Sequence, residues 1–494
     1  MENKFHLCKI RLRRNFTALE NLLAKFGAES IIGPQHPQDF LQETCCLAKT
    51  EHMEREKSSW VKAHHLVLTR LSGAGKTLKD TMTDPIRVLI CGTGSGAHAL
   101  AAVASRNPRF EVRVLTQSTD RAQRWTEILK RERLTVMVRN GTDTQVPWKA
   151  NAFMVTDQPE QAARGCDLII FAVPAFRHQK YLTSLEPYIE DGCVIVGLPG
   201  QNGFEFDVRV ALGPRLKNCV VMNFDSLPWI CRTTEFGRSA TISATKDQLV
   251  GALQGDLTRA RLTDPLAAMR SLLGKPPKLI VSGHLLGITL RSLNAYSHPP
   301  IMYGRWKDWN GKALKRPPLF YQDIDEETAE LLGQISEEVV ATSKSIMAQY
   351  PQVDLSQVIP MYDWDIGCYG KDIKDKTNLM TALRTNSGYA GITHPMIQTE
   401  NGEYLPDFNH RFLTEDVPFG LVVIRGIAEI AGTPTPCMDR VLAWCQDKLG
   451  KQYLVGSSLT GKDLSSTRCP QRYGFTTMTD VLGLELSQAA AQSR

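Results

Sequence analysis

The chain has 494 residues, of which 42% are hydrophobic and 22% are charged. This length and composition are typical of a globular protein with a large core, and they limit the chain to about three domain-sized units. The formal net charge of +6 is small for this size, and lysines and arginines are interspersed with aspartates and glutamates. The sequence therefore shows no cluster of basic residues of the kind that binds nucleic acid. Its small positive net charge is compatible with small anionic ligands.

The 12 cysteines are scattered along the chain, and none lies in a C-x-x-C or Cys/His spacing suited to zinc. We therefore expect reduced thiols and no bound metal. No apolar run approaches the roughly 18 residues that a membrane-spanning helix needs, and the first residues show no cleavable signal pattern. These features predict a cytoplasmic protein that does not enter a membrane.

Residues 1–84 differ from the rest of the chain because they show no sustained β alternation. Their basic start leaves a targeting segment open as an alternative to a disordered extension. The segment 72–77 faintly resembles a phosphate-binding loop, but the required first glycine would fall at Arg70 and no strand leads into it. We therefore interpret this segment as a linker and residues 1–84 as an extension.

An apolar strand, a glycine turn and a helix of small residues follow one another in residues 86–98. Gly92 permits a tight turn, and Gly94 lacks the Cβ that would block a phosphate group. Ala97 keeps the helix close to the sheet, and the free N–H groups at the helix start face the anion. With a second apolar strand over 110–116, this pattern predicts a dinucleotide-binding unit. The alternative is a strand–helix turn that binds no nucleotide.

Strand-like and helix-like segments alternate after residue 85. Strands are expected over 87–91, 112–116, 167–174 and 193–199, and helices from residue 97 and over 122–130. Strands as continuously apolar as these are usually covered by helices on both faces. The alternation predicts an α/β fold with a Rossmann-type, doubly wound parallel sheet, whose ligands lie at the carboxyl ends of the strands. Three segments should then rim a cofactor crevice: 172–175, 197–200 and 223–226.

A helical period replaces this alternation past about residue 284. One helix is predicted over 325–348, with Asp325 as its N-cap. Five residues fall on one face of this helix: Leu332, Ile335, Val339, Thr342 and Ile346. We therefore expect a mainly α-helical second domain after the Rossmann domain. The predicted divisions are an extension over 1–84, a dinucleotide-binding domain over 85–284, a helical substrate domain over 285–480 and a tail over 481–494.

A dinucleotide-binding domain joined to a helical domain points to hydride transfer, which needs a proton donor or acceptor beside the substrate carbon. His298 is one candidate, because the prolines that follow it would end a helix and fix the imidazole at its exit. Asp416, in the charged segment 409–420, is another. Each has a structural alternative. A histidine at a helix end often only satisfies carbonyls, and Asp416, two residues before Pro418, is also placed to be an N-cap.

The sequence also resembles the opine dehydrogenases, a family that includes the octopine, tauropine, strombine and alanopine dehydrogenases of marine invertebrates. The resemblance runs from about residue 86 to about residue 474, and only the first 84 residues lack a counterpart. It is carried by the blocks 92–98, 114–116, 173–176, 196–199, Gln201 with 203–206, 227–232, 298–299 with 304–306, 318–322, 411–418, 459–463 and 468–475. A match spread over so many separate blocks is specific.

The resemblance implies a reductive condensation. An α-keto acid, typically pyruvate, and the amino group of an amino acid form an imine, which NADH reduces to a secondary-amine dicarboxylic acid. Such an enzyme would reoxidise NADH at the end of anaerobic glycolysis. Its cofactor would be NAD without a metal.

The resemblance also implies roles for individual residues. His298 would exchange a proton with the condensing centre, and Asp416 would orient its ring and stabilise the imidazolium. Arg411 would hold the keto-acid carboxylate, because its planar guanidinium can bond both oxygens. Three residues, on loops after two sheet strands, would line the amino-acid pocket: Gln201, Asp225 and Cys231. Eight residues would bind the cofactor: Gly92, Gly94, Ser95, Gly96, Ala97, Thr116, Val173 and Pro174.

Four residues limit what the resemblance implies. Ser95 stands where family members commonly carry Asn, a polar exchange that should not prevent pyrophosphate binding. Thr116 and Gln117 end the second strand in place of the acidic residue expected on an NAD ribose, so the fingerprint alone leaves NAD or NADP open. Asp225 could pair with a guanidinium side chain, bind the substrate ammonium or cap a turn. The preferred amino acid therefore stays open.

Two other functions remain as alternatives. A single-substrate hydroxy-acid dehydrogenase of the same fold would turn over a keto acid with no amine present. A non-catalytic nucleotide-binding protein would bind NADH without turnover. For the leading hypothesis we expect a monomer whose partners are small-molecule substrates, with neither nucleic acid nor a membrane.

Overall fold

The computed structural model describes residues 84–139 and 145–484 of the chain. The description that follows concerns the unit Asp84–Arg494. Almost all of the predicted extension over 1–84, and residues 485–494 of the predicted tail, lie outside the described residues. Within the described residues, no helix is both long and apolar enough to cross a membrane.

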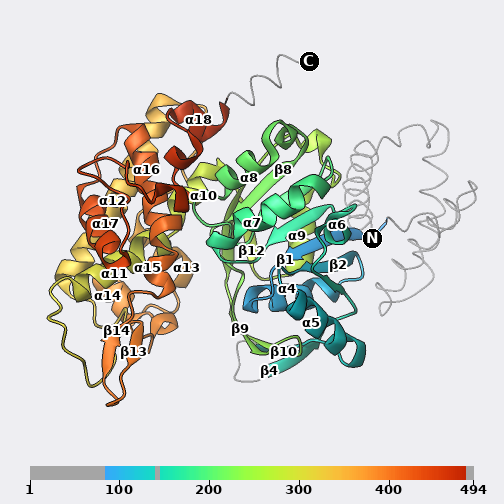
Figure 1. Cartoon of the computed structure of the whole chain (residues 1–494), viewed down its shortest axis with the longest axis horizontal. Helices are drawn as coiled ribbons and strands as arrows, with labels where there is room; N and C mark the ends of the chain where they lie inside the picture. Colours follow the sequence, from blue (N-terminus) through green and yellow to red (C-terminus); the bar gives the residue numbers. More distant parts are fainter. Residues whose placement is uncertain (1–83, 140–144, 485–494) are drawn as a thin grey trace, which may run out of the picture. The chain divides into compact units, whose positions relative to one another are not determined.

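An eight-stranded sheet forms the centre of the first domain (Figure 1). In the order β12-β11-β8-β7-β6-β1-β2-β5, its strands are β12 (Lys278–Val281), β11 (Gln248–Gln254), β8 (Val220–Phe224), β7 (Val194–Gly197), β6 (Leu168–Phe171), β1 (Ile86–Cys91), β2 (Phe110–Leu115) and β5 (Met154–Thr156). All neighbours from β8 to β5 pair in parallel, with Val88 opposite both Val112 and Leu168. The predicted parallel core is confirmed.

The last two strands, β11 and β12, were not among the predicted strands and extend the sheet beyond its parallel core. β11 runs antiparallel to β8, and β12 pairs in parallel with β11. The chain leaves the sheet after β8 and returns to β11 through a second sheet, so β11 enters from the opposite end. Apolar runs carry no information on strand direction, which is why the sequence pattern did not show this reversal.

Helices cover both faces of the large sheet, as a doubly wound fold requires. They are α4 (Ser95–Ser105), α5 (Thr119–Arg131), α6 (Pro159–Ala163), α7 (Ala175–Leu185), α8 (Phe204–Leu212) and α9 (Pro265–Leu273). Alternate residues of β1 enter different cores. Val88 and Ile90 pack in one core with α4 and α9, whereas Leu89 and Cys91 pack in the other with α7 and α8.

A second sheet of four strands was not predicted. Its order is β4 (Gln145–Lys149), β3 (Thr135–Arg139), β10 (Ser239–Thr245) and β9 (Trp229–Glu235). Polar residues alternate with buried ones in these strands, as in the segment Ser239–Thr245, where Ala240 and Ile242 are fully buried. This alternation is a weaker sequence signal for a strand than the continuous apolar runs of the large sheet.

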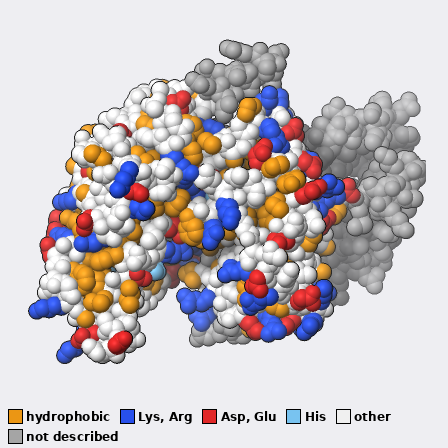
Figure 2. All heavy atoms as spheres, viewed as in Figure 1, with side chains coloured by type: hydrophobic (Ala, Val, Ile, Leu, Met, Phe, Trp, Pro, Cys, Tyr) orange, Lys and Arg blue, Asp and Glu red, His pale blue; other side chains and the backbone are white. Residues whose placement is uncertain are grey.

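The second domain is mainly helical. Its helices are α10 (Leu285–Arg291), α11 (Asn294–Trp306), α12 (Glu326–Gln349), α13 (Met361–Tyr369), α14 (Leu379–Thr385), α15 (Arg411–Thr414), α16 (Val422–Ala431), α17 (Pro436–Leu449) and α18 (Met478–Leu482). A hairpin of β13 (Met396–Gln398) and β14 (Tyr404–Pro406) and a π-helical turn, η7 (Val417–Leu421), complete it. Short 3₁₀ turns in the two domains are η3 (Glu186–Tyr188), η4 (Gly213–Asn218), η5 (Leu257–Arg259), η6 (Ser387–Tyr389), η8 (Leu464–Ser466) and η9 (Pro470–Tyr473). On the face drawn in Figure 2, basic and acidic side chains are interspersed over most of the surface.

The long helix α12 confirms the predicted helix over 325–348. Asp325 is its N-cap and accepts a hydrogen bond from the backbone N–H of Thr328. The five residues predicted to share one face are all buried: Leu332, Ile335, Val339, Thr342 and Ile346. The amphipathic period thus located both the start of this helix and its core face.

The prediction that prolines end a helix at His298 is wrong. His298, Pro299 and Pro300 all lie inside α11, which is kinked at Tyr296 (φ −124°, ψ 17°). The segment after this kink is in effect a new helix. The first four N–H groups of a helix have no partner within it, so prolines in the first turn cost no hydrogen bond.

Candidate active site

The glycine turn lies between β1 and α4. Gly92 has a φ of +119°, and a Cβ added there would lie 2.5 Å from Cγ1 of Val173, so this position requires glycine. Gly94 directly precedes α4 with an ordinary φ of −81°. A Cβ at Gly94 would meet no atom of the described residues within 4 Å. The space above Gly94 is therefore open, as a bound pyrophosphate requires.

The other residues of the turn shape the start of α4. Its first turn carries no acidic residue and no side-chain cap, which leaves this helix end suited to an anion. The Ser95 hydroxyl accepts a hydrogen bond from the backbone N–H of Thr233, at 2.9 Å. Gly96 lies against Leu227, and Ala97 is fully buried. Ser95 thus anchors α4 to β9, while the backbone amides remain for the ligand.

The buried side chain of His98 supports the glycine turn. Its Nδ1 donates to the carbonyl of Gly94 at 3.0 Å, and its Nε2 accepts from the backbone N–H of Gly237 at 2.9 Å. Its ring stacks on Trp125, with centroids 4.1 Å apart. Burial lowers the pKa of His98 to about 4, so the ring is neutral at physiological pH. This histidine is structural and holds the glycine turn in place.

The end of β2 carries no acidic residue. Thr116 is buried, and its hydroxyl accepts a hydrogen bond from the backbone N–H of Ser118. Arg121, at the start of α5, donates to the Thr93 hydroxyl at 3.1 Å. A basic side chain thus lies beside the glycine turn. Thr116 and Gln117 therefore offer no carboxylate at the strand end where an NAD ribose would meet one.

Val173 and Pro174 lie between β6, the strand next to β1, and the start of α7. The carbonyl of Val173 accepts a hydrogen bond from His178 Nε2 at 2.9 Å. Arg468 donates to His178 Nδ1 at 2.6 Å and to the carbonyl of Ala175 at 2.9 Å. The segment that contains the predicted cofactor residues Val173 and Pro174 is therefore held by His178 and by Arg468, which lies nearly 300 positions further along the chain.

Arg468 also holds the loop after β7. Its guanidinium donates to the carbonyls of Gly200 at 3.0 Å and Asn202 at 2.8 Å, and Asp207 pairs with its Nε at 2.7 Å. The side chain is fully buried. A buried, multiply bonded guanidinium of this kind rigidifies the loops around it. Arg468 is a positioning residue for the two loops that face the helical domain.

His298 and Asp416 are brought together in the helical domain. His298 Nδ1 lies 2.8 Å from Asp416 Oδ2, and both side chains are buried. Because a carboxylate only accepts, Nδ1 carries the proton and Nε2 is left as the acceptor. Nε2 lies 3.1 Å from the Tyr321 hydroxyl, and Phe412 packs on the imidazole with centroids 3.9 Å apart. The geometry is that of an oriented acid–base group.

This arrangement decides against a simple cap at Asp416. Asp416 precedes the π-helical turn η7, but its side chain makes no capping hydrogen bond. The carboxylate instead bonds to an imidazole that lies 118 positions earlier in the chain. Burial of Tyr321 raises the pKa of its hydroxyl, so it stays protonated and donates to Nε2.

Arg411 is half-exposed and lies at the boundary with the first domain. Its guanidinium pairs with Glu415 at 2.9 Å. The other oxygen of Glu415 accepts from the backbone N–H of Ala175 at 3.0 Å and from the Gln201 amide at 3.4 Å. Gln201 itself has a φ of +60°, which is uncommon for a residue other than glycine. Arg411 and Gln201, both predicted, are thus joined through Glu415.

The other two residues predicted for the amino-acid pocket are Asp225 and Cys231. Asp225 directly follows β8, but its carboxylate is buried against Arg291, with Oδ2 2.9 Å from Nε. Cys231 lies within β9 rather than on a loop after a strand, so that expectation is corrected. Burial raises the pKa of Cys231 to about 11, and the thiol is protonated at neutral pH.

Four residues of this arrangement were given no role by the sequence. They are Tyr321, Glu415, Arg468 and His178. The spacing of Glu415, four residues after Arg411, was a usable signal, because such a pair faces the same side of a helix. The other three act through contacts between distant segments, which no local pattern reveals.

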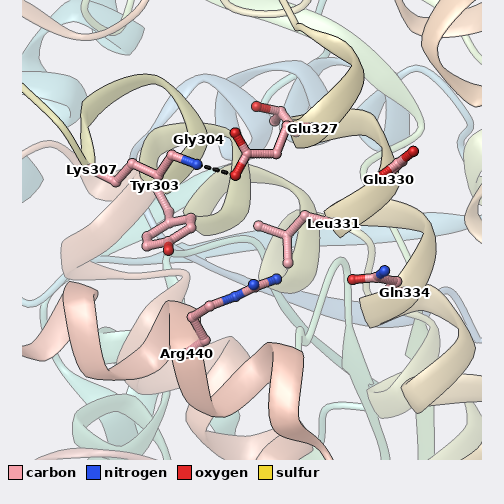
Figure 3. Close-up of a pocket in the computed structure, with 9 residues that line it drawn as sticks. Tyr303, Gly304, Lys307, Glu327, Glu330, Leu331, Gln334 and Arg440 are labelled. Carbon is pink, nitrogen blue, oxygen red and sulfur yellow. Dashed lines mark hydrogen bonds and ion pairs between the residues drawn. The ribbon is translucent and has the colours of Figure 1, made fainter.

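A hollow of about 130 Å³ on the helical domain lies apart from this site (Figure 3). It is lined by residues of α11, α12 and α17, which include Tyr303, Leu331 and Arg440, and none of its lining residues is His298, Arg411 or Asp416. Its Lys307 and Glu327 pair with each other. In the described part of the chain, no group of three or more His, Cys, Asp or Glu side chains is placed to hold a metal ion.

The Rossmann domain has a glycine turn with space for a pyrophosphate, and the helical domain that follows it carries a buried His–Asp pair. Together these features define a two-domain nicotinamide-dependent dehydrogenase. Comparisons with known proteins agree. Residues 281–449 match the family described as NAD/NADP octopine/nopaline dehydrogenase, alpha-helical domain. An opine dehydrogenase of Haliotis discus hannai is 48% identical over 406 residues, which are 82% of this chain and 100% of that protein. A tauropine dehydrogenase of Arabella iricolor is 47% identical over 80% of this chain and 99% of its own length.

Solved structures give the same result. An octopine dehydrogenase with NADH and L-arginine is 42% identical, with a TM-score of 0.77 over 80% of this chain and 98% of that one. Octopine dehydrogenase with NADH and pyruvate matches with a TM-score of 0.75, at 41% identity over the same shares. The chain belongs to the opine dehydrogenase family, and it is an NAD-dependent oxidoreductase that acts on CH–NH donors.

Proposed function

We propose that this protein condenses pyruvate with the amino group of an amino acid and reduces the resulting imine to a secondary amine. When bound, NADH supplies the hydride that reduces the C=N carbon, and a proton completes the amine. The observation that carries the proposal is the buried His298–Asp416 pair, which lies in the same folded unit as the open glycine turn. Octopine dehydrogenase, solved with NADH and either pyruvate or L-arginine, supports this substrate pair.

His298 would exchange the proton at the condensing centre through Nε2. Asp416 fixes the tautomer by holding the proton on Nδ1, and its charge would stabilise the imidazolium that forms when Nε2 takes a proton. In the structure, Tyr321 donates to Nε2. This hydroxyl would give way to the substrate, or pass the proton on, when the site is filled.

Arg411 would bind the pyruvate carboxylate. Its guanidinium is half-exposed, can bond both oxygens of a carboxylate and is oriented by Glu415. Gln201, on the other side of Glu415, would contact the second substrate. The cofactor would lie over the glycine turn, with its pyrophosphate at the start of α4 and its nicotinamide near Val173 and Pro174.

The same activity suggests a place in metabolism. Condensation of pyruvate with an amino acid releases water, and reduction of the imine oxidises one NADH to NAD, so the protein would reoxidise NADH at the end of anaerobic glycolysis. We further infer a monomeric protein of the cytoplasm, where pyruvate and NADH are produced.

A spectrophotometric panel tests this proposal. The full chain is mixed with NADH and pyruvate, and NADH loss is followed with glycine, alanine, taurine or arginine present or with no amine. We expect NADH loss that depends on one of the amines and a secondary amine as the product by mass spectrometry. Turnover without any amine would favour a hydroxy-acid dehydrogenase, and NADH binding without turnover would favour a non-catalytic protein.

A further inference from the structure

The strand end that follows β2 carries no negative charge. Thr116 and Gln117 stand there, and the Thr116 hydroxyl accepts a hydrogen bond from the backbone N–H of Ser118 at 3.2 Å. In a Rossmann domain this strand end meets the adenosine ribose of the cofactor, and an acidic residue there bonds the ribose 2′-hydroxyl of NAD. NADPH carries a phosphate on that hydroxyl, which a carboxylate would repel. Neither residue at this strand end would repel it.

Arg121 places a positive charge beside the same strand end. Its Nη1 donates to the hydroxyl of Thr93, which lies between the two glycines of the turn, and its guanidinium carbon lies 5.9 Å from the ring centroid of Phe236. Within residues 84–139 and 145–484, no carboxylate forms an ion pair with Arg121. The preceding Asp120 pairs with Arg124 instead, at 3.6 Å. The exposed guanidinium therefore keeps most of its N–H donors for an anion.

Two uncharged side chains add donors in the same turn. Both polar atoms of the Gln117 amide are shielded from solvent and have no hydrogen-bond partner in the described part of the chain. Buried polar groups are normally paired, and this amide can turn toward a ligand without breaking a hydrogen bond. The Ser118 hydroxyl accepts from the backbone N–H of Arg121 at 3.3 Å, so its own proton remains available to a ligand.

Asp157 is the acidic residue that follows the neighbouring strand β5. One of its carboxylate oxygens accepts from the Thr119 hydroxyl at 2.6 Å, and the other accepts from the Gln158 amide at 2.9 Å. The sheet order places β5 and β1 on opposite sides of β2. Asp157 and the glycine turn after β1 therefore lie on different sides of the strand that ends at Thr116.

We propose that Arg121, together with Gln117 and Ser118, binds the 2′-phosphate of NADPH, and that this protein therefore binds NADPH as well as NADH. The inference rests on the cofactor placement proposed above. A phosphate gains a charge-assisted hydrogen bond from the guanidinium, and the amide and the hydroxyl add neutral donors. With NADH, these neutral groups would meet the ribose 2′-hydroxyl instead. The reduction itself is unchanged, because the extra phosphate lies on the adenosine ribose and not on the nicotinamide.

Fluorescence titrations of the full chain with NADH and with NADPH test the inference without turnover. We expect the Kd for NADPH to lie within about 10-fold of the Kd for NADH, and a weaker affinity for NADPH than this would overturn the inference. A chain that binds neither nucleotide would overturn the cofactor placement together with it. A chain that binds both nucleotides but turns over neither with any amine would contradict only the proposed function.

Variants of Arg121 separate its charge from its contact with the turn. Arg121→Gln should raise the Kd for NADPH at least about 10-fold more than the Kd for NADH, because only NADPH loses an ion pair. Arg121→Lys keeps the charge and should restore most of the NADPH affinity. Arg131→Gln is the matched control, because Arg131 is an exposed arginine at the other end of α5. Equal losses of both nucleotides in Arg121→Gln would show a structural role and overturn the inference.

Gln117→Glu gives an independent check from the other side of the turn. The new carboxylate can accept from a ribose hydroxyl but repels a phosphate, so this variant should lose NADPH binding and retain NADH. Unchanged binding of NADPH in this variant would place the 2′-phosphate elsewhere and overturn the inference. Circular dichroism and thermal unfolding check that each variant is folded.

Discussion

Glu415, in the helical domain, accepts a hydrogen bond from the backbone N–H of Ala175 in the Rossmann domain, at 3.0 Å. The same carboxylate pairs with Arg411, so one buried side chain links the residue proposed to bind the keto acid to the start of α7, which follows Val173 and Pro174. Burial raises the pKa of Glu415, and Arg411 opposes this effect. The position of Arg411 therefore depends on a residue that touches both domains.

We expect Glu415→Gln to raise the KM for pyruvate by about 3- to 10-fold with a smaller change in kcat. The amide keeps an acceptor for Ala175 but loses the charge that orients Arg411, and the half-exposed guanidinium makes the effect modest. Glu429→Gln is a matched control, because Glu429 pairs with Arg425 at the same i,i+4 spacing within the helical domain. An equal rise in the KM of both variants would argue against the role of Glu415.

His298→Ala should lower kcat by roughly 10²-fold or more, as the loss of acid–base assistance usually does. Binding of NADH, followed by fluorescence, should change little, because His298 is not part of the glycine turn. Unchanged turnover in this variant would refute the assignment of His298.

Tyr321→Phe should lower kcat several-fold and shift the pH profile of kcat. The hydroxyl donates to Nε2 of His298 at 3.1 Å, so its removal changes the proton affinity of the imidazole while the ring still packs on Phe320 and Tyr389. Tyr389→Phe is the control, because its hydroxyl donates to Asp365 rather than to His298. A pH profile that moves in the control alone would contradict the prediction.

Gly94→Ala should raise the KM for NADH by at least about 10-fold and leave thermal stability almost unchanged. The added Cβ contacts no described protein atom and the backbone there is suited to alanine, so only a ligand over the turn would meet it. Gly92→Ala provides the contrast, because its φ of +119° and the contact with Val173 should destabilise the fold itself. An unaltered KM in Gly94→Ala would place the pyrophosphate elsewhere.

Glu205 predicts a pH dependence of stability. Burial raises its pKa to about 7 from the ordinary 4.5, and Thr289 donates a hydrogen bond to it. Because the folded state binds the proton more tightly, its contribution is fully present below about pH 4.5 and is lost as the pH rises through 7. Glu205→Gln should remove this loss and be more stable at pH 8, by about 3 kcal/mol at most. Chemical denaturation at pH 5 and pH 8 measures the difference, and an unchanged pH dependence would contradict it.

The sequence alone determined where the central strands of the large sheet, the glycine turn and the long helix α12 lie. These features depend on periods and turn residues that act within a few positions, so apolar runs, Gly92 and the Asp325 cap were sufficient to place them. The choice of His298, Arg411 and Asp416 as candidates also came from the sequence, although their roles were implied by a family resemblance rather than by spacing.

The tertiary structure alone decided which partners these residues have. His298 and Asp416 are 118 positions apart, Asp225 and Arg291 are 66 apart, and Ala175 and Glu415 are 240 apart. Such pairs form only when sheet order and domain packing bring separate segments together, and a one-dimensional pattern does not encode that geometry. For this reason the sequence left Asp225 open to a substrate guanidinium, whereas the folded chain supplies one of its own.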